Sequence, residues 1–177
     1  MVQTINSIGT LQLWIILRVT VRTTGWIGFG LSPNGDMSNS DVILAWTING
    51  SVQFRDAHTV DSVTQPIVYH SVQNWQRLYY SLKNGVTTVI FKRSIKVCNP
   101  DQPASKISID VAATQYVIFA WGTSFNKSTN LPMYHNTNRG AKFLSLLSSL
   151  NNQIKLNMTQ IERLNCSVTV YKINISV

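Results

Sequence analysis

The dipeptide Asn49-Gly50 constrains the fold more than any other feature of this 177-residue sequence. Both central positions of a type I′ turn need a positive φ, so an Asn-Gly pair between β-prone segments predicts a two-residue β-hairpin. Residues 41–48 are apolar and β-prone, and residues 51–58 would form the returning strand. A two-residue turn places Asp41 opposite His58, and it thereby determines which side chains share a face of the hairpin.

Similar turn and alternation patterns recur along the chain. Further strands are predicted at residues 16–22, 25–31, 75–81, 86–93, 115–121 and 166–177. Residues 122–138 are polar and irregular, which indicates a long loop, and residues 141–150 fit either a strand or a helix. Strands spaced by about 8–12 residues with turn residues between them are typical of a sandwich or a barrel. We therefore predict one all-β domain, an immunoglobulin-like antiparallel β-sandwich.

Two glycines alternate with apolar residues in the strand predicted at residues 25–31. Gly28 and Gly30 leave one face of that strand without side chains. A glycine inside a strand often marks a place where other atoms approach closely. We expect a second sheet or a ligand to lie against this face.

Acidic residues are concentrated in one part of a basic chain. The chain has 15 Lys and Arg against 7 Asp and Glu, a net charge of +8. Arg55 is nevertheless the only Lys or Arg between residues 36 and 61, a window that holds Asp36, Asp41, Asp56 and Asp61. A bound cation is one physical reason for such clustering.

The hairpin register places Asp41 and Asp56 on one face, as diagonal neighbours within about 8 Å. The same face carries Ile43, Ala45 and Phe54, so it is expected to point toward the core. Two carboxylates at the end of a buried face repel each other and resist burial.

A Ca²⁺ ion would neutralise these two carboxylates. Asp36 and the backbone carbonyls of the turn at residues 32–39 would complete its shell of oxygen ligands. Calcium is the only cofactor that we expect this chain itself to bind. The alternatives are that both aspartates lie at the solvated edge of the sheet, or that they pair with Arg22 or His58.

No other constellation points to catalysis. The three histidines lack the spacing of a metal motif, and no phosphate-binding loop or nucleophile elbow occurs. Met37, Met133 and His135 are of types that ligate haem, but their spacing does not favour a haem site. Asp41 and Asp56 are close enough for a hydrolase in principle, but we expect them to face inward rather than into a cleft.

The distribution of charge and polarity narrows the range of partners. Basic residues are scattered, with Lys92-Arg93 as the longest run, which argues against nucleic-acid binding. The apolar stretch at residues 11–17 is too short to span a membrane and lacks the features of a signal peptide, so we expect no membrane insertion. Five Asn-X-Ser/Thr sequons still favour a secretory or extracellular route with glycosylation. They begin at Asn49, Asn126, Asn157, Asn165 and Asn174.

Several segments match one known family in order and spacing. They are residues 18–33, Met37, 41–43, 52–56, 73–75, 87–93, 98–101, 118–121, 134–140 and 145–147. Together they cover roughly residues 15–147 and resemble the DOMON domain of dopamine β-hydroxylase-like copper monooxygenases. Residues 134–140, Tyr-His-Asn-Thr-Asn-Arg-Gly, are most similar to the branch called monooxygenase, dopamine β-hydroxylase-like.

The resemblance implies a DOMON β-sandwich at residues 15–150, after a diverged or truncated segment at 1–14. Residues 151–177 would form a C-terminal strand region, where a missing copper domain could begin. The implied role is a non-catalytic module, a fragment or a stand-alone domain, that packs against copper monooxygenase domains of a parent chain or of another protein. Copper and ascorbate would belong to the full-length enzyme only. The alternative within the wider family is a haem- or sugar-binding DOMON module.

The two cysteines, Cys98 and Cys166, are too few for a disulfide framework and wrongly spaced for a zinc site. The resemblance implies that their partners lie in domains outside this chain. We therefore expect that they do not pair with each other.

Overall fold

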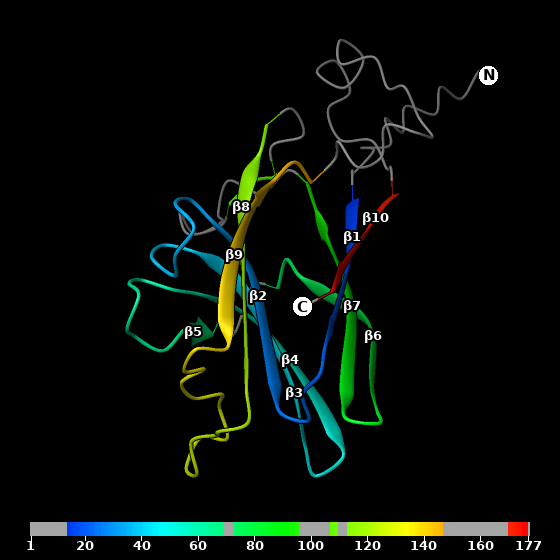
Figure 1. Cartoon of the computed structure of the whole chain (residues 1–177), viewed down its shortest axis with the longest axis vertical. Coiled ribbons are helices and arrows are strands. Elements are labelled where there is room, and N and C mark those ends of the chain that lie inside the picture. The colour runs from blue at the N-terminus through cyan, green and yellow to red at the C-terminus, as the bar shows by residue number, and fades with distance from the viewer. Residues whose placement is uncertain (1–13, 69–72, 96–106, 110–112, 147–169, 177) are drawn as a thin grey trace, which may run out of the picture.

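Two facing β-sheets form the part of the protein that the computed structural model describes, residues 14–68, 73–95, 107–109, 113–146 and 170–176. The six-stranded sheet lies on the left of Figure 1 and the four-stranded sheet on the right. The strands are β1 (Trp14–Val21), β2 (Trp26–Ser32), β3 (Asp41–Ile48), β4 (Ser51–His58), β5 (Ile67–Val68), β6 (Gln76–Lys83), β7 (Val86–Ser94), β8 (Gln115–Gly122), β9 (Arg139–Leu144) and β10 (Val170–Ser176). These ranges contain no helix, and thus none that could cross a membrane.

The strand order is β10-β1-β7-β6 in the smaller sheet and β5-β4-β3-β2-β8-β9 in the larger one. Neighbouring strands are antiparallel throughout, except that β1 and β10 run parallel. The predicted all-β antiparallel sandwich is confirmed.

Alternate side chains of the two sheets meet in one core. In β1 the odd-numbered residues from Ile15 to Val21 are buried, as period-two alternation predicts for a half-buried strand. Phe91 of β7 and Phe29 of β2 come from different sheets, and their ring centroids lie 5.5 Å apart. The core therefore spans the space between the sheets.

The Asn49-Gly50 turn sets the hairpin register as predicted. Asn49 has φ 49° and Gly50 has φ 77°, the positive values that a type I′ turn requires. Asp41 pairs with His58, and Ile43 pairs with Asp56.

The central strands β2 and β3 of the six-stranded sheet are largely apolar and buried on both faces, whereas an antiparallel sheet often has one face in water. Every residue of β2 is buried. On the outer face, Trp26 and Trp46 pack beneath Phe125 and Leu131 of the long loop between β8 and β9. A second outer cluster comprises Val42, Ala57 and Ile118, with Met37 and Val68 packed against it. Loops therefore form an additional layer over this sheet.

The glycines of β2 face this outer layer. A Cβ added to Gly30 would lie 2.5 Å from Val42 Cγ1 and 2.8 Å from the carbonyl oxygen of Asp41. At Gly30 the close neighbour is therefore the adjacent strand β3, and our expectation of a second sheet or a ligand is wrong there.

Most of the predicted strands are confirmed, with ends shifted by a few residues. The ambiguous segment at 141–150 contains the end of a strand, β9. The short strand β5 was not predicted. The C-terminal strand exists as β10, and it joins the sandwich beside β1, although the sequence placed it in a separate C-terminal region.

Candidate functional site

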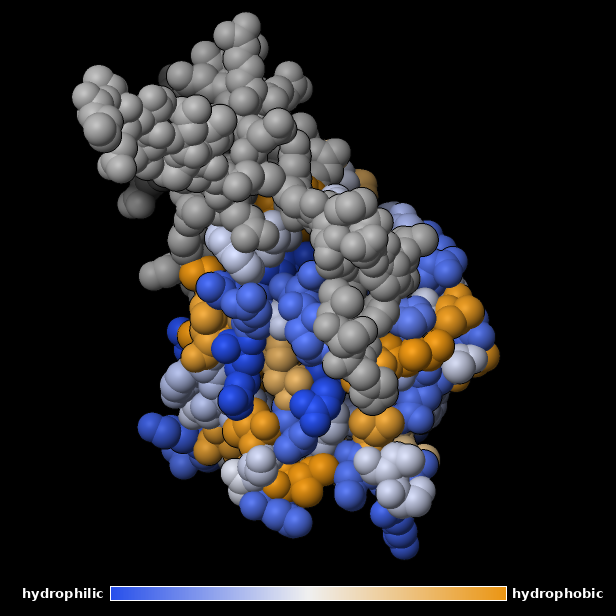
Figure 2. Space-filling view, turned by 180° about the vertical axis from the view of Figure 1, so that it is seen from behind, coloured by the Kyte–Doolittle hydropathy of each residue, from blue (hydrophilic) through white to orange (hydrophobic). Residues whose placement is uncertain are grey.

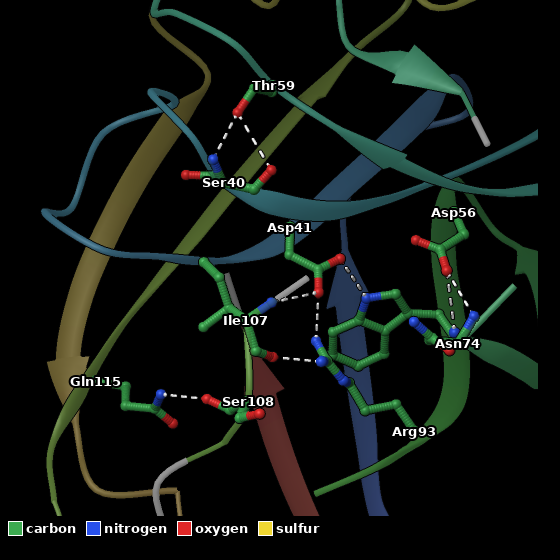
Figure 3. Close-up of polar contacts among 10 residues, drawn as sticks. Ser40, Asp41, Asp56, Thr59, Asn74, Arg93, Ile107, Ser108 and Gln115 are labelled. Atoms are coloured by element: carbon green, nitrogen blue, oxygen red, sulfur yellow. Dashed lines mark hydrogen bonds and ion pairs between the residues drawn. The ribbon is translucent and has the colours of Figure 1, made fainter. Parts of the chain in front are cut away.

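A buried ion pair links the two sheets at the end where β3 begins (Figure 3). Asp41 is the first residue of β3, and Arg93 lies near the end of β7. Both side chains are fully buried, and Arg93 Nη1 donates to Asp41 Oδ2 at 2.7 Å. Burying two charges is costly unless each is well paired, and here the guanidinium directly neutralises the carboxylate.

Further groups complete the surroundings of Asp41. Trp75 Nε1 donates to Asp41 Oδ1 at 3.2 Å, and the Ile107 backbone N–H donates to Asp41 Oδ2 at 3.2 Å. Arg93 Nη2 donates to the carbonyl of Ile107, and its guanidinium carbon lies 4.7 Å from the centroid of the Trp75 ring. The contacts of Asp41 and Arg93 therefore connect both sheets with the segments at 73–75 and 107–109.

Asp56 is also fully buried, and its carboxylate accepts hydrogen bonds from backbone groups. Its Oδ2 accepts hydrogen bonds from the backbone N–H groups of Asn74, at 2.6 Å, and Trp75, at 3.4 Å. The Asp56 N–H donates to Gln73 Oε1 at 3.2 Å. Trp75 thus contacts both carboxylates, Asp41 through its indole and Asp56 through its backbone.

The predicted placement of Asp41 and Asp56 on one inward face is confirmed, and the solvated-edge alternative is wrong. The positive partner that the described residues show for Asp41 is Arg93. Arg22, which the sequence offered for that role, follows the opposite end of β1. Asp36 is exposed, and its Oδ1 accepts a hydrogen bond from the Ser38 N–H at 2.7 Å.

Calcium binding by these aspartates stays a prediction. The described residues contain no group of three or more His, Cys, Asp or Glu side chains that could hold a metal ion. A cation at Asp41 would have to share that carboxylate with Arg93.

The fourth aspartate of the acidic window, Asp61, shapes the loop that follows β4. Its Oδ2 accepts a hydrogen bond from Thr64 Oγ1 at 2.7 Å. Its Oδ1 accepts from the backbone N–H groups of Thr64, at 2.6 Å, and Val63, at 2.8 Å. These bonds, foremost that from the Thr64 hydroxyl, hold the pKa of the Asp61 carboxyl below its ordinary value of 3.8.

We expect the loop contacts of Asp61 to persist into acid. A carboxyl whose folded pKa is lowered stabilises the structure above its unfolded pKa, and this contribution is lost as the pH falls through the folded pKa. The amide proton shifts of Val63 and Thr64 should therefore titrate with a midpoint below 3.8. Asp61→Asn should abolish the titration. A midpoint at or above 3.8 in the parent chain would contradict the role given to these hydrogen bonds.

The residues of haem-ligating type lie apart from one another or face solvent. His135 is buried, with its ring centroid 6.4 Å from that of Trp26, at the start of β2. Met37 packs against the cluster that contains Val42, beside the other end of β2. Met133 is half exposed. Met37 and His135 therefore do not form a pair around one common centre.

A groove of about 390 Å³ opens at one end of the sandwich, which we call the hairpin end because the turn between β6 and β7 lies there. This end is opposite to the buried ion pair. Trp121 and Tyr134 supply aromatic surface in its wall, and Arg22 supplies the only charge. Its other lining residues are Thr23, Thr24, Gly85, Gly122, Thr123, Ser124, Asn136 and Asn138. This mixture of aromatic rings, amides and hydroxyls suits a polar ligand that also has an apolar face.

Residues 10–122 match the DOMON domain family. The chain belongs to that family. This DOMON chain is 30% identical over 135 residues to DBH-like monooxygenase protein 1 of Homo sapiens, in a match that covers 76% of the chain and 21% of the relative. The chain thus spans about a fifth of the length of the curated relatives that it matches over most of its own length. The resemblance seen in the sequence is confirmed.

Two solved structures share the DOMON fold. The cytochrome domain of Myriococcum thermophilum cellobiose dehydrogenase is 17% identical, with a TM-score of 0.53, over 72% of this chain and 63% of that one. The cytochrome b domain of pyranose dehydrogenase from Coprinopsis cinerea is 15% identical, with a TM-score of 0.55, over 88% and 76%. At these identities the likeness concerns the fold alone.

The remaining predicted sites of the DOMON chain are only partly described. Asn49 is exposed at its hairpin turn, and the side-chain oxygen of Asn126 accepts hydrogen bonds from Ser128 N and Oγ at 2.9 and 2.7 Å. Asn174 lies in β10. Four further predicted residues fall outside the described ranges, namely Cys98, Cys166, Asn157 and Asn165.

Proposed function

We propose that this DOMON domain is a non-catalytic module of a dopamine β-hydroxylase-like copper monooxygenase. It packs against the copper domains of a parent chain or of another protein, and those domains use copper and ascorbate. The homology to DBH-like monooxygenases supports the setting, and the partners of the buried carboxylates support the non-catalytic role.

One observation carries the proposal: the two buried carboxylates are both engaged by the fold. Asp41 is neutralised by Arg93, and Asp56 accepts backbone hydrogen bonds from Asn74 and Trp75. A general acid or base must reach the proton that it transfers, directly or through one water. Neither residue has exposed surface, so the arrangement suits a structural role.

The purified chain should bind less than one copper per molecule and should not hydroxylate phenethylamine with ascorbate. Copper sites in proteins are built from clustered histidine, cysteine or methionine ligands, and the sequence offers no such motif. Metal analysis after copper loading and dialysis, with an oxygen-uptake assay, measures both properties. One tightly held copper per chain with ascorbate-dependent turnover would overturn the proposal.

Saccharide binding is the second candidate function, and the groove at the hairpin end favours it. A sugar ring could stack on Trp121 or Tyr134 and donate its hydroxyls to Asn136 and Asn138. Titration with mono- and oligosaccharides, followed by tryptophan fluorescence, tests this function. A saturable change that Trp121→Ala removes would support it, and no change at millimolar sugar would dismiss it.

Calcium binding at Asp41, Asp56 and Asp36 is tested separately from the main proposal. A cation that binds only the folded state raises the melting temperature by mass action. Asp41→Asn or Asp56→Asn should then remove the gain, and Asp61→Asn should keep it. An unchanged melting temperature with millimolar Ca²⁺ after chelator treatment would contradict the calcium site.

We also place the chain in the secretory pathway, on the same resemblance. Asn49 offers an exposed sequon at a turn, where a glycosylating enzyme can reach its side chain. Expression in a secreting eukaryotic host should give a product whose mass falls on treatment with a glycan-removing amidase, and Asn49→Gln should reduce that fall.

A further inference from the structure

Exposed apolar side chains gather on two neighbouring loops. In the described part of the chain, nine large apolar or aromatic residues are exposed. Five of these lie in the loop and strand after β4 or in the loop between β8 and β9: Val60, Val63, Ile67, Met133 and Tyr134. We call this set the loop surface. Val63, at 89% exposed, is the most accessible of the nine.

The two loops contact each other directly. Gln65 Nε2 donates to the carbonyl of Pro132 at 2.8 Å, which brings Ile67 and Met133 to the same side of the molecule. Both loops lie on the left of Figure 1, beside β5 and below it. The half-turn of Figure 2 carries this side to the right, where apolar residues are visible at the surface.

Hydrogen bonds and packing within this chain fix the conformation of the loop surface in the absence of a partner. Asp61 fixes the turn that carries Val63 through its hydrogen bonds to Val63 and Thr64. Phe125 and Leu131 anchor the second loop against Trp26 and Trp46 on the sheet. A preorganised surface loses little conformational entropy on binding.

The loop surface is also almost without charge on a strongly basic chain. Residues 57–68 and 123–138 contain two charged side chains of opposite sign, Asp61 and Lys127, whereas the whole chain has a net charge of +8. Depletion of charge with aromatic and methionine side chains is typical of the core of a protein interface. It does not suit a membrane surface or a nucleic acid, which would attract basic residues.

We propose that the loop surface is where this DOMON domain docks on the copper domains of its monooxygenase. The inference rests on the proposed function and adds the contact face to it. The chain corresponds to 21% of the human relative, so a homologous enzyme supplies a large permanent neighbour. Apolar, uncharged contact faces are those that permanent neighbours share.

A chimaera of the human DBH-like monooxygenase, with the complete chain in place of its matching segment, tests the inference. Amide hydrogen exchange is compared between the chimaera and the isolated chain. We expect exchange in residues 59–68 and 131–134 to slow by about tenfold or more in the chimaera, because docking excludes water from these amides. Val63→Asp should restore fast exchange there. Leu78→Asp, at an exposed residue of β6 in the other sheet, should not.

The outcomes separate the two proposals. Protection on another face, unaffected by Val63→Asp, would overturn the loop surface and leave the packing function standing. Protection nowhere in a folded chimaera would overturn both.

Discussion

Arg93→Met should lower the free energy of unfolding by about 3–5 kcal/mol, because it leaves a fully buried carboxylate without its positive partner. The methionine keeps much of the apolar stem of Arg93, so the loss reports mainly the charge and its hydrogen bonds to Asp41 and Ile107. Urea unfolding measures the change through the midpoint at constant slope.

The adjacent residue offers a matched control. Lys92 lies on the outer face of the same strand, with its Nζ 4.4 Å from the centroid of the Trp14 ring. Lys92→Met should cost less than about 1 kcal/mol, the range of an accessible cation–π contact. Adding Asp41→Leu to Arg93→Met should recover part of the loss, since apolar pairs often replace buried ion pairs without penalty. Strictly additive losses in the double variant would contradict the pairing.

Trp75→Ala should also cost about 3–5 kcal/mol, the range for emptying a buried aromatic position. Trp75 is 1% exposed, and its ring centroid lies 5.4 Å from that of Phe91 and 6.3 Å from that of Phe29. The indole also donates to Asp41 Oδ1. Trp75→Phe keeps most of the buried surface and removes that donor, so it should cost about 1–3 kcal/mol.

Trp14→Ala is the control, because it also removes an indole but at a position away from the two buried carboxylates. Trp14 is only partly buried, on the outer face of β1. Its removal should cost less than half as much as the removal of Trp75. Equal losses in the free energy of unfolding at the two positions would mean that the contacts of Trp75 with the two carboxylates add no stability.

The alternation and turn residues predicted most of the fold, because both act locally. The Asn49-Gly50 turn correctly placed Asp41 and Asp56 on one inward face, since register follows from turn length. The same alternation could have found Arg93. In β7 the residues Thr87, Val89, Phe91 and Arg93 share the buried face. The inward placement of Arg93 could therefore have been predicted from the sequence, whereas its pairing with Asp41 could not.

Long-range contacts account for what the sequence did not predict. The pairing of Asp41 with Arg93 joins residues 52 positions apart in different sheets, and the contact of Gln65 with Pro132 joins residues 67 positions apart. Neither pairing follows from a local period. The layer of loops over the six-stranded sheet was also missed, because polar residues such as those at 122–138 predict a solvated loop and hide the anchors Phe125 and Leu131.

The kinetics of Asp41→Asn in the chimaera test the central claim, that the buried carboxylates hold the fold and take no part in chemistry. We predict a lower melting temperature, with kcat for the monooxygenase reaction unchanged within about twofold, because the partners that the structure describes for Asp41, namely Trp75, Arg93 and Ile107, all belong to the sandwich. General acid or base catalysis contributes about 10²–10⁴-fold to a rate. A fall in kcat of about 100-fold or more at an unchanged melting temperature would contradict the account.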